Sequence, residues 1–399
     1  MYDAIVVGAR CTGSATAMLL ARRGYRVLVV DRTTFPSDTI STHWLHEPAV
    51  GRLRDWGLLD PVLDSGCPPI EKVTFDIGPF ALSGRPTPAD GVAFSLSCRR
   101  TVLDKILVDA AVVAGAEVRE HFPVQEILME EDGRAVGIRG GGDHGGIEER
   151  GRVIVGADGQ NSLVARSVGA TEYNVKPRLS ATYYRYFDDL PLDGMEIYAR
   201  VGDGGALFPT NDGLSLLVVG WTHDQFHGIR KDLAGNLVRA ASNFSPSVAE
   251  RLSRATFATR VYGKADIRNY YRTPVGPGWA LAGDAGYHKD PITAQGITDA
   301  FRDAEVLSAA IDEGLTYGDL ESPMKRFHAL RDEATLPMYE FTTELARMEP
   351  PTPQQQQLFG ALRGNQGQID RFLGVIAGTV PVQEFFSPEN IGQVMSAAA

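Results

Sequence analysis

A strand, a helix and a second strand are predicted at the start of the chain, and this unit constrains the fold more than any other feature. The three elements cover residues 2–7, 14–23 and 26–30. Gly8 stands where the first strand turns toward the helix, Gly13 where the helix would pack on that strand, and Asp31 at the end of the second strand. In such a unit the first helical N–H groups point at a pyrophosphate and the acid reaches a ribose hydroxyl. The chain is therefore expected to bind an adenine dinucleotide.

Arg10 occupies the position at which this motif usually has its middle glycine, the residue that lets the backbone approach the phosphates. Because guanidinium geometry suits phosphate oxygens, we expect the Arg10 cation to lie against the pyrophosphate instead. The alternative is a tight turn in an ordinary α/β domain. Gly24 as a helix stop and Asp31 at the usual distance favour the nucleotide-binding interpretation.

Composition sets wider bounds. The 399 residues are 43% hydrophobic and 22% charged, enough chain for two domains with full cores. A net charge of −11 argues against a nucleic-acid surface, because binding to a phosphate backbone needs clustered Lys and Arg. Cys11, Cys67 and Cys98 have no CxxC spacing and frame neither a disulfide scaffold nor a zinc site, so a reducing compartment is expected.

The sequence predicts no membrane-spanning or targeting segment. Apolar runs such as 216–219 are far shorter than the roughly 20 residues that cross a bilayer. The chain enters its first predicted strand directly, without the pattern of a signal peptide. We expect a cytoplasmic protein without nucleic acid or membrane partners.

Two later strands also end in segments of Gly and Asp. The apolar strand 153–155 leads into Gly-Ala-Asp-Gly at 156–159. The strand 279–282 leads into Gly-Asp-Ala at 283–285, and a helix is predicted over 297–313. Ligands bind at the carboxyl ends of strands in open α/β sheets, and the start of the helix at 297 is free to face a ligand.

The segments between these motifs are simpler. Residues 101–114 predict a helix with Thr101 and Asp104 spaced as a capping pair. Short strands follow near residues 118, 124–128 and 135–139. A Gly-rich loop over 140–146 has no helix after it and is therefore not a second nucleotide site.

A central region has the alternation of an antiparallel sheet, with strands over 180–187 and 205–221 and a turn at 211–213. From residue 320 the pattern is helical, punctuated by Pro337 and three prolines at 350–353. We interpret this last part as helices that cover one face.

The three glycine segments, in this order, resemble the flavoprotein monooxygenases of the para-hydroxybenzoate hydroxylase type, up to about residue 315. The resemblance implies that Asp31 binds the adenosine ribose of FAD, that Asp158 and Gly159 border the pyrophosphate and the nicotinamide approach, and that Asp284 holds the ribityl chain. Arg100 matches an Arg-x-x-Leu-Asp element that reaches FAD, although a surface cation at a helix start is an equal alternative. The residues expected to bind FAD are Gly8, Arg10, Cys11, Gly13, Asp31, Arg32, Arg100, Val124, Asp158, Gly159, Gly283, Asp284, Pro291, Gly296 and Ile297.

The expected fold is therefore α/β, with a Rossmann-like FAD-binding domain built on a parallel sheet, an inserted antiparallel-sheet substrate domain and C-terminal helices. The expected FAD-binding domain is discontinuous, over 1–176 and 265–318. The substrate domain covers 177–264, and the helical region covers 319–399.

Some residues depart from the hydroxylase pattern. Tyr287 and Asp290-Pro291 stand where the hydroxylases often have His and a later Pro-Pro, and Asp-Pro there is similar to flavin halogenases and geranylgeranyl reductases. The halogenase Trp-x-Trp-x-Ile-Pro element is absent from the sequence, which argues against halogenation. Phe-Pro at 208–209 resembles part of a Phe-Pro-Lys segment of the reductases, with Thr210 in place of Lys.

The resemblance implies that reduced flavin reacts with dioxygen to form a peroxyflavin, while the protein supplies orientation, a dry pocket and positive potential. NADH or NADPH would dock transiently near Asp158, or a partner flavin reductase would supply electrons. The helix start at Gly296 and Ile297 is expected to stabilise negative charge on the reduced ring.

Substrate-side candidates are less specific. Tyr183, Tyr184, Arg185 and His223 lie on the alternating strands, where half of the side chains point away. His43 and His46 follow Asp31 at a distance typical of a flavin-facing segment. The candidates for acid–base work are His43, Tyr184 and His288, and core or surface positions are the ordinary alternative for each. No cluster has metal-ligand spacing.

We therefore predict an FAD-dependent monooxygenase of an aromatic or polyketide-like small molecule. The alternatives are a flavin-dependent reductase of an isoprenoid or other activated double bond, and a flavin-binding carrier without catalysis.

Overall fold

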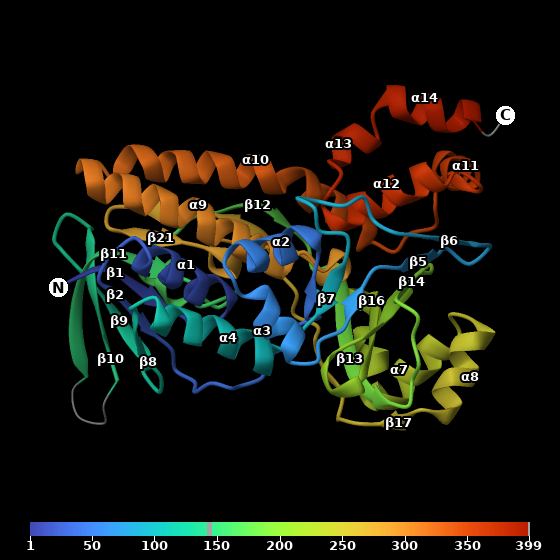
Figure 1. Ribbon diagram of the computed structural model, residues 1–399, viewed down its shortest axis with the longest axis horizontal. Coiled ribbons are helices and arrows are strands. Elements are labelled where there is room, and N and C mark those ends of the chain that lie inside the picture. Colours follow the sequence, from blue (N-terminus) through green and yellow to red (C-terminus); the bar gives the residue numbers. More distant parts are fainter. Residues whose placement is uncertain (142–145, 398–399) are drawn as a thin grey trace.

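Two large sheets lie side by side in the computed structural model, which describes residues 1–141 and 146–397 (Figure 1). The first sheet contains the N-terminus, and the helices after residue 345 lie beside the second. This mixed architecture confirms the predicted α/β fold class. Residues 142–145 of the predicted Gly-rich loop lie outside the described residues.

The first sheet has a parallel centre, β11-β1-β2, extended by parallel β21 and β8 and by antiparallel β20. Its strands are β1 (Tyr2–Val7), β2 (Val27–Val30), β8 (Glu117–Arg119), β9 (Val124–Met129), β10 (Ala135–Gly140), β11 (Ile147–Gly156), β20 (Val275–Gly276) and β21 (Trp279–Leu281). The carboxyl ends of β1, β2, β11 and β21 share one edge, and the three glycine segments follow three of them.

Three helices pack on one face of this sheet: α1 (Cys11–Ala21), α4 (Arg100–Val113) and α9 (Gly296–Tyr317). All but one residue of α1 are buried, because α4 and α9 pack against it from both sides. The expected capping pair in α4 is wrong: Arg99 is the N-cap, no side chain caps the helix, and Asp104 contacts two arginines instead.

The second sheet has the order β17-β13-β16-β15-β14-β5-β6, and β18 also pairs with β13. Its strands are β5 (Val73–Asp76), β6 (Ala81–Gly84), β13 (Ser180–Asp188), β14 (Met195–Ala199), β15 (Asp203–Pro209), β16 (Ser215–Thr222), β17 (Thr256–Phe257) and β18 (Tyr262–Lys264). All neighbours are antiparallel except β14 and β5. The turn predicted at 211–213 is a 3-10 turn between β15 and β16.

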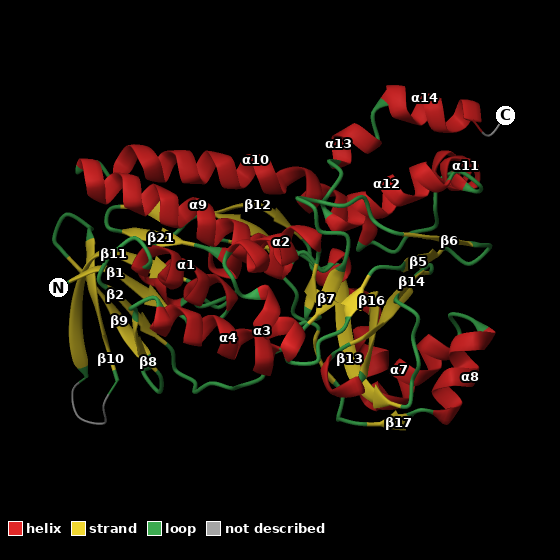
Figure 2. Cartoon of the chain, viewed as in Figure 1, coloured by secondary structure: helices red, strands yellow, loops and turns green. Residues whose placement is uncertain are grey.

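Helices cover both faces of the second sheet (Figure 2). Tyr184 and Tyr186 of β13 pack toward the C-terminal helices, whereas Tyr183 and Phe187 pack toward α7 (Leu233–Ser242) and α8 (Pro246–Arg254). This two-residue period is the alternation that the sequence predicted.

Two features differ from the predicted boundaries. Strands β5 and β6 come from residues 73–84, so the second sheet draws on chain well before residue 177. Helix α10 (Glu321–Leu345) runs through Pro337, which the sequence analysis had taken as an interruption. A helix tolerates such a proline where neighbouring packing compensates for the lost hydrogen bond.

Short elements complete the fold. The other strands are β3 (Trp44–Leu45), β4 (Pro69–Ile70), β7 (Ser95–Ser97), β12 (Glu172–Lys176), β19 (Asn269–Arg272) and β22 (Tyr287–His288). The other helices are α2 (Glu47–Asp55), α3 (Leu59–Asp64), α5 (Leu163–Ser167), α6 (Phe226–Ile229), α11 (Pro353–Leu362), α12 (Gln366–Ala377), α13 (Val382–Phe385) and α14 (Pro388–Ala397). Within the described ranges, every helix is too short or too polar to cross a bilayer.

Candidate active site

A cavity of about 1000 Å³ runs from the carboxyl edge of the first sheet to β13 and β18 of the second. This volume is at the upper end of the range for small-molecule sites, as a dinucleotide requires. Every residue expected to bind FAD lines the cavity except Gly13. The structure thus brings together motifs that lie far apart in the sequence.

Two glycines of the cavity leave no room for a side chain. Gly8 has a φ of +103°, and a Cβ atom there would lie 2.4 Å from the carbonyl oxygen of Ala157. Gly283 has a φ of +57°, and its Cβ would lie 2.2 Å from Oγ1 of Thr12. Gly13 allows close packing instead, since a Cβ atom added there would lie 1.8 Å from the Gly8 carbonyl oxygen. The absence of side chains at these glycines lets the loops of the first sheet lie close together beside the cavity.

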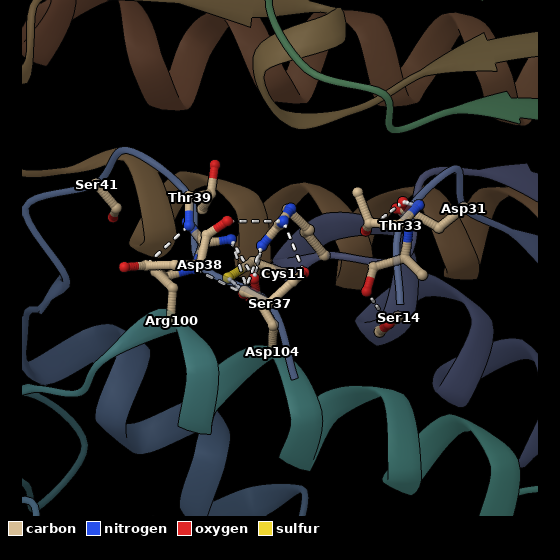
Figure 3. A network of polar contacts seen from close by, with 12 residues as sticks. Cys11, Ser14, Asp31, Thr33, Ser37, Asp38, Thr39, Ser41, Arg100 and Asp104 are labelled. Carbon is tan, nitrogen blue, oxygen red and sulfur yellow. Dashed lines mark hydrogen bonds and ion pairs between the residues drawn. The ribbon is translucent and has the colours of Figure 1, made fainter. Parts of the chain in front are cut away.

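Arg10 and Arg100 share one buried carboxylate, that of Asp104. Figure 3 shows Arg100 and Asp104 of α4 in a polar network with the loop at Ser37 and Asp38. Arg10 donates to Asp104 Oδ2 at 2.5 Å, and Arg100 donates from Nε to Oδ1 at 2.9 Å. Arg10 also donates to Ser37 and to the carbonyl oxygen of Asp38, which ties the loop after β2 to α4. With two cations and one anion, the cluster of Arg10, Arg100 and Asp104 carries a net positive charge.

This cluster corrects two interpretations. The Arg10 guanidinium points to Asp104 and the loop at 37–38, where its hydrogen bonds are already made, rather than standing free for a pyrophosphate. Arg100 is 9% exposed, so it is not the surface cation that the sequence left as an alternative. The Asp104 carboxylate holds the pKa of Arg100 above its ordinary value despite burial.

Asp31 and Asp158 are held by backbone N–H groups. Asp31 accepts from Ala9 N at 2.8 Å and from N and Oγ1 of Thr33 at 2.8 Å. Asp158 Oδ2 accepts from Leu163 N at 2.6 Å, while its buried Oδ1 has no partner in the described part of the chain. Burial raises the pKa of Asp158. An orphaned carboxylate oxygen beside the cavity fits a ligand that donates a hydroxyl.

The first turn of α9 faces the cavity with Gly296 and Ile297. Within the described residues, no protein acceptor is recorded for the backbone N–H groups of these two residues. The start of a helix carries partial positive charge, so it fits an electron-rich ring edge. Asp284 also lines the cavity, and its side chain is 52% exposed. The cavity residues therefore fit FAD.

The wall contributed by the second sheet carries hydroxyl and aromatic groups. Thr182 and Tyr184 of β13 line the cavity, and Tyr184 stacks on Tyr262 with ring centres 5.6 Å apart. Burial raises the pKa of Tyr184 to about 12, so its hydroxyl stays protonated. Lys264 lines the same wall and donates to the side-chain oxygen of Gln160.

Three of the four candidates named for the strands face away. Tyr183 packs in the core under α7 and stacks on Phe226, and Arg185 donates to the carbonyl oxygen of Thr259. His223 lies in the 3-10 turn after β16 and does not line the cavity.

The three histidines near the cavity have different positions. His43 does not line it: its ring contacts the Tyr186 hydroxyl, its φ is 59°, and burial lowers its pKa to about 3. His46 joins two loops, because Trp44 Nε1 donates to His46 Nδ1 and His46 Nε2 therefore donates to the Thr293 carbonyl oxygen. His288 lines the cavity, and burial lowers its pKa.

Sequence reasoning missed a buried network behind the cavity loop. Asp299 accepts from the Tyr287 hydroxyl at 2.6 Å, from Arg302 at 2.8 Å and from Lys289. These cations lower the pKa of Asp299 to about 2. A carboxylate in the predicted first turn of the helix was the only signal, and it did not reveal the partners. No group of acidic, His and Cys side chains in the described residues is arranged to hold a metal ion.

Residues 1–331 match the model of the FAD binding domain family. The chain belongs to this family. The match covers all three motifs and supports FAD as the cofactor, as the sequence predicted.

Several relatives differ in their reactions. The 1H-pyrrole-2-carbonyl-[peptidyl-carrier protein] brominase of Pseudoalteromonas luteoviolacea is 24% identical, over 83% of this chain and 81% of that protein. Rifampicin monooxygenase of Streptomyces venezuelae is 26% identical, over 83% of this chain and 68% of that protein. Digeranylgeranylglycerophospholipid reductase 2 of Methanopyrus kandleri is 27% identical, over 74% of this chain and 73% of that protein. The superfamily named from the motifs is thus confirmed.

Solved structures share the fold. The flavin-dependent brominase Bmp2 has a TM-score of 0.82 at 19% identity, over 99% of this chain and 98% of that chain. PqsL of P. aeruginosa, in complex with 2-aminobenzoylacetate, has a TM-score of 0.74 at 22% identity, over 94% of this chain and 99% of that chain.

Proposed function

We propose that this protein is an FAD-dependent monooxygenase that inserts one oxygen atom from dioxygen into an aromatic or polyketide-like small molecule. The observation that carries the proposal is the continuous cavity, which joins the FAD-binding motifs to the hydroxyl and aromatic wall of the second sheet. A substrate on that wall would lie beside the reactive ring without crossing solvent.

The residues of the first wall would hold FAD along its length. Asp31 would bind the adenosine ribose, and the start of α1 with Arg100 would face the pyrophosphate. Asp284 would hold the ribityl chain, and the free N–H groups of Gly296 and Ile297 would stabilise negative charge on the ring. Arg10 would act indirectly, by holding the loop at 37–38 on α4.

FAD, when bound and reduced, supplies the activation of dioxygen. The chain contributes burial and orientation. Tyr184, backed by Tyr262, and Ile267 would pack against an aromatic ligand, and the Thr182 and Tyr184 hydroxyls would orient its polar groups. Excluding water from this wall would protect the reactive species from hydrolysis and decay.

The reductant in this proposal is NADH or NADPH, reaching the flavin from the Asp158 side. A separate flavin reductase is the other source of electrons. Anaerobic mixing of the FAD-loaded protein with each nucleotide separates the two, because bleaching of the flavin absorbance without a second protein identifies direct reduction.

The test of the function uses isotopically heavy dioxygen. The reduced, FAD-loaded protein is mixed with a panel of phenols and polyketide-like compounds, and the products are weighed by mass spectrometry. One heavy oxygen atom per product molecule is expected. Oxygen consumption that yields only hydrogen peroxide with every compound would contradict the proposal, and so would a halogenated product formed when bromide or chloride is added.

Reduction of a double bond is the second candidate, favoured by the Asp290-Pro291 pair and by the reductase relative. A reductase would oxidise its own reduced flavin under nitrogen when given an isoprenoid alkene. A monooxygenase would leave the reduced flavin unchanged until dioxygen is admitted.

A further inference from the structure

Asp290 lies where the loop of the FAD site meets the second sheet, and the proposed FAD contacts do not use it. It is 1% exposed and lines the cavity. Its Oδ2 accepts a hydrogen bond from Ser180 Oγ at 2.6 Å, and its Oδ1 accepts from Ile292 N at 3.1 Å. Ser180 is the first residue of β13, so this carboxylate connects the loop to the substrate wall.

A second hydroxyl continues the connection. Ser180 Oγ lies 3.3 Å from Thr182 Oγ1, and Thr182 lines the cavity. Residues 180, 182 and 184 point to the same face of β13 because strand side chains alternate. Asp290, Ser180, Thr182 and the cavity are therefore connected in that order.

The ionised carboxylate fixes the direction of these hydrogen bonds. A carboxylate only accepts, so Ser180 donates to Asp290 and its oxygen is left to accept from Thr182. The Thr182 oxygen is then left as an acceptor toward the cavity. A ligand that meets this row of hydroxyls has to bring an O–H or N–H donor.

We propose that Thr182, Ser180 and Asp290 form a proton relay that takes up the proton of a phenolic or enolic hydroxyl on the substrate. This proposal rests on the proposed monooxygenase function and identifies the substrate class as phenols or enols. The substrate proton passes to Thr182 Oγ1, the Thr182 proton passes to Ser180 Oγ, and the Ser180 proton passes to Asp290 Oδ2. The electron pair of the broken O–H bond stays on the substrate oxygen, which makes the ring richer in electrons as it is attacked.

The surroundings suit this role. Burial raises the pKa of Asp290 to about 6, so the carboxylate is ionised at neutral pH yet accepts a proton readily. The other titratable groups that line this part of the cavity are Tyr184 of β13, Lys264 of β18, Asp284, Tyr287, His288 and Lys289 of the segment that leads to Asp290, and Asp299 of α9. Lys289 and Asp299 pair with each other, and Lys264 contacts Gln160. In the described part of the chain, Ser180 is the one side chain that hydrogen-bonds to the Asp290 carboxylate, while the Asp290 backbone N–H donates to Oδ1 of Asn269 at 2.7 Å.

The test compares the binding of phenol with that of anisole, its methyl ether, to the oxidised, FAD-loaded protein by calorimetry. One hydrogen bond to the Thr182 oxygen predicts that phenol binds about 2- to 10-fold more tightly at pH 8. The preference should fall as the pH drops through the pKa of Asp290, because a protonated carboxyl group no longer fixes the direction of the relay. Thr182→Val should remove the preference, and Thr182→Ser, which keeps the hydroxyl, should restore it.

Asp290→Asn tests the far end of the relay. It keeps an oxygen for Ile292 N but cannot take up a proton, so the phenol preference should become independent of pH. Flavin absorbance checks that each variant is folded and loaded. Failure of phenol to bind, or an equal preference in the wild type and Thr182→Val, would overturn the relay. Since this test uses neither reductant nor dioxygen chemistry, its failure leaves the isotope test of the proposed function standing.

Discussion

The wall from the first sheet holds several charged side chains in short contacts with other protein groups, whereas the wall from the second sheet presents hydroxyl groups, aromatic rings and one lysine to the cavity. On the first wall, Asp104 joins Arg10 to Arg100, and Asp31 is held by three donors. On the second wall, Thr182 and Tyr184 stand beside open volume. The arginines and Asp31 of the first wall are thus positioned by contacts within the protein, while the Thr182 and Tyr184 side chains of the second wall can contact a ligand in the cavity.

This difference separates two kinds of mutational effect. Changes in the first wall should cost folding stability and FAD together, because the same contacts serve both. Changes in the second wall should affect ligand choice while FAD and stability are retained.

Gly8→Ala should cause the largest loss. Its φ of +103° is strained for alanine, and the new Cβ would overlap the Ala157 carbonyl oxygen. Strain and overlap together should lower the free energy of unfolding by about 2–6 kcal/mol. Denaturant unfolding and the flavin-to-protein absorbance ratio measure both effects. Gly24→Ala is the control, since Gly24 has a φ of +88° but nothing within 4 Å of a Cβ. An equal loss in both variants would show that overlap at Gly8 contributes nothing.

Asp104→Asn should reduce the free energy of unfolding by about 3–5 kcal/mol, because it leaves the Arg100 charge buried without a partner. Asp109→Asn on the same helix is the matched control. Its partner Lys105 is half exposed, and such surface pairs are worth at most about 1 kcal/mol. Urea unfolding of the two variants without FAD tests the difference. A loss of similar size in both would contradict the role given to the arginine cluster.

The buried carboxyl group of Glu47, in α2, should make the free energy of unfolding depend on pH. Burial raises its pKa from 4.5 to about 7, so the folded state binds more protons than the unfolded state between these values. Stability from this group is complete below about pH 4.5 and is lost as the pH rises through 7. The loss is at most about 3 kcal/mol.

Glu47→Gln removes this titration. The difference in unfolding free energy between the variant and the wild type should therefore move in favour of the variant from pH 5 to pH 8. Exposed Glu131→Gln serves as the control. A constant difference across this range would show that Glu47 does not titrate there.

Tyr184→Phe should have the smallest effect on folding. It removes one long hydrogen bond, from Ser41 N at 3.4 Å, which is worth about 0.5–1.5 kcal/mol at most. FAD content should be unchanged, while the affinity for phenolic ligands falls. Tyr183→Phe, on the opposite face of β13, should change neither property. Loss of FAD from Tyr184→Phe would contradict the separate roles given to the two walls.

The FAD side of the cavity was largely predictable because short motifs encode it. Gly8 and Asp31 follow their strands directly, Asp158 and Asp284 lie in the turns just after theirs, and parallel strands place their carboxyl ends at one edge. Local order along the chain therefore implies proximity in space. The side-chain partner of Arg10 was not predictable, since Asp104 is 94 residues away and was interpreted as a capping residue.

The substrate side was predictable only in outline. Alternation predicted a sheet, but it did not decide whether Tyr183 or Tyr184 faces the cavity, because a shift of one residue exchanges the faces. Strands β5 and β6 joined this sheet from residues 73–84, which no local pattern indicated. The Asp290-Pro291 pair was noticed as a departure, while its link to Ser180 depends on a strand that begins 110 residues earlier.

The nucleotide-binding unit, the fold class and the family could be inferred from local sequence, because they depend on glycines, acids and strand ends that are close together in the chain. The pairing of charges, the face of β13 that meets the cavity, and the connection from Asp290 through Ser180 to Thr182 follow only from the packed fold. These contacts join residues from distant segments, and their energies depend on burial and distance, which exist only after the sheets and helices have packed.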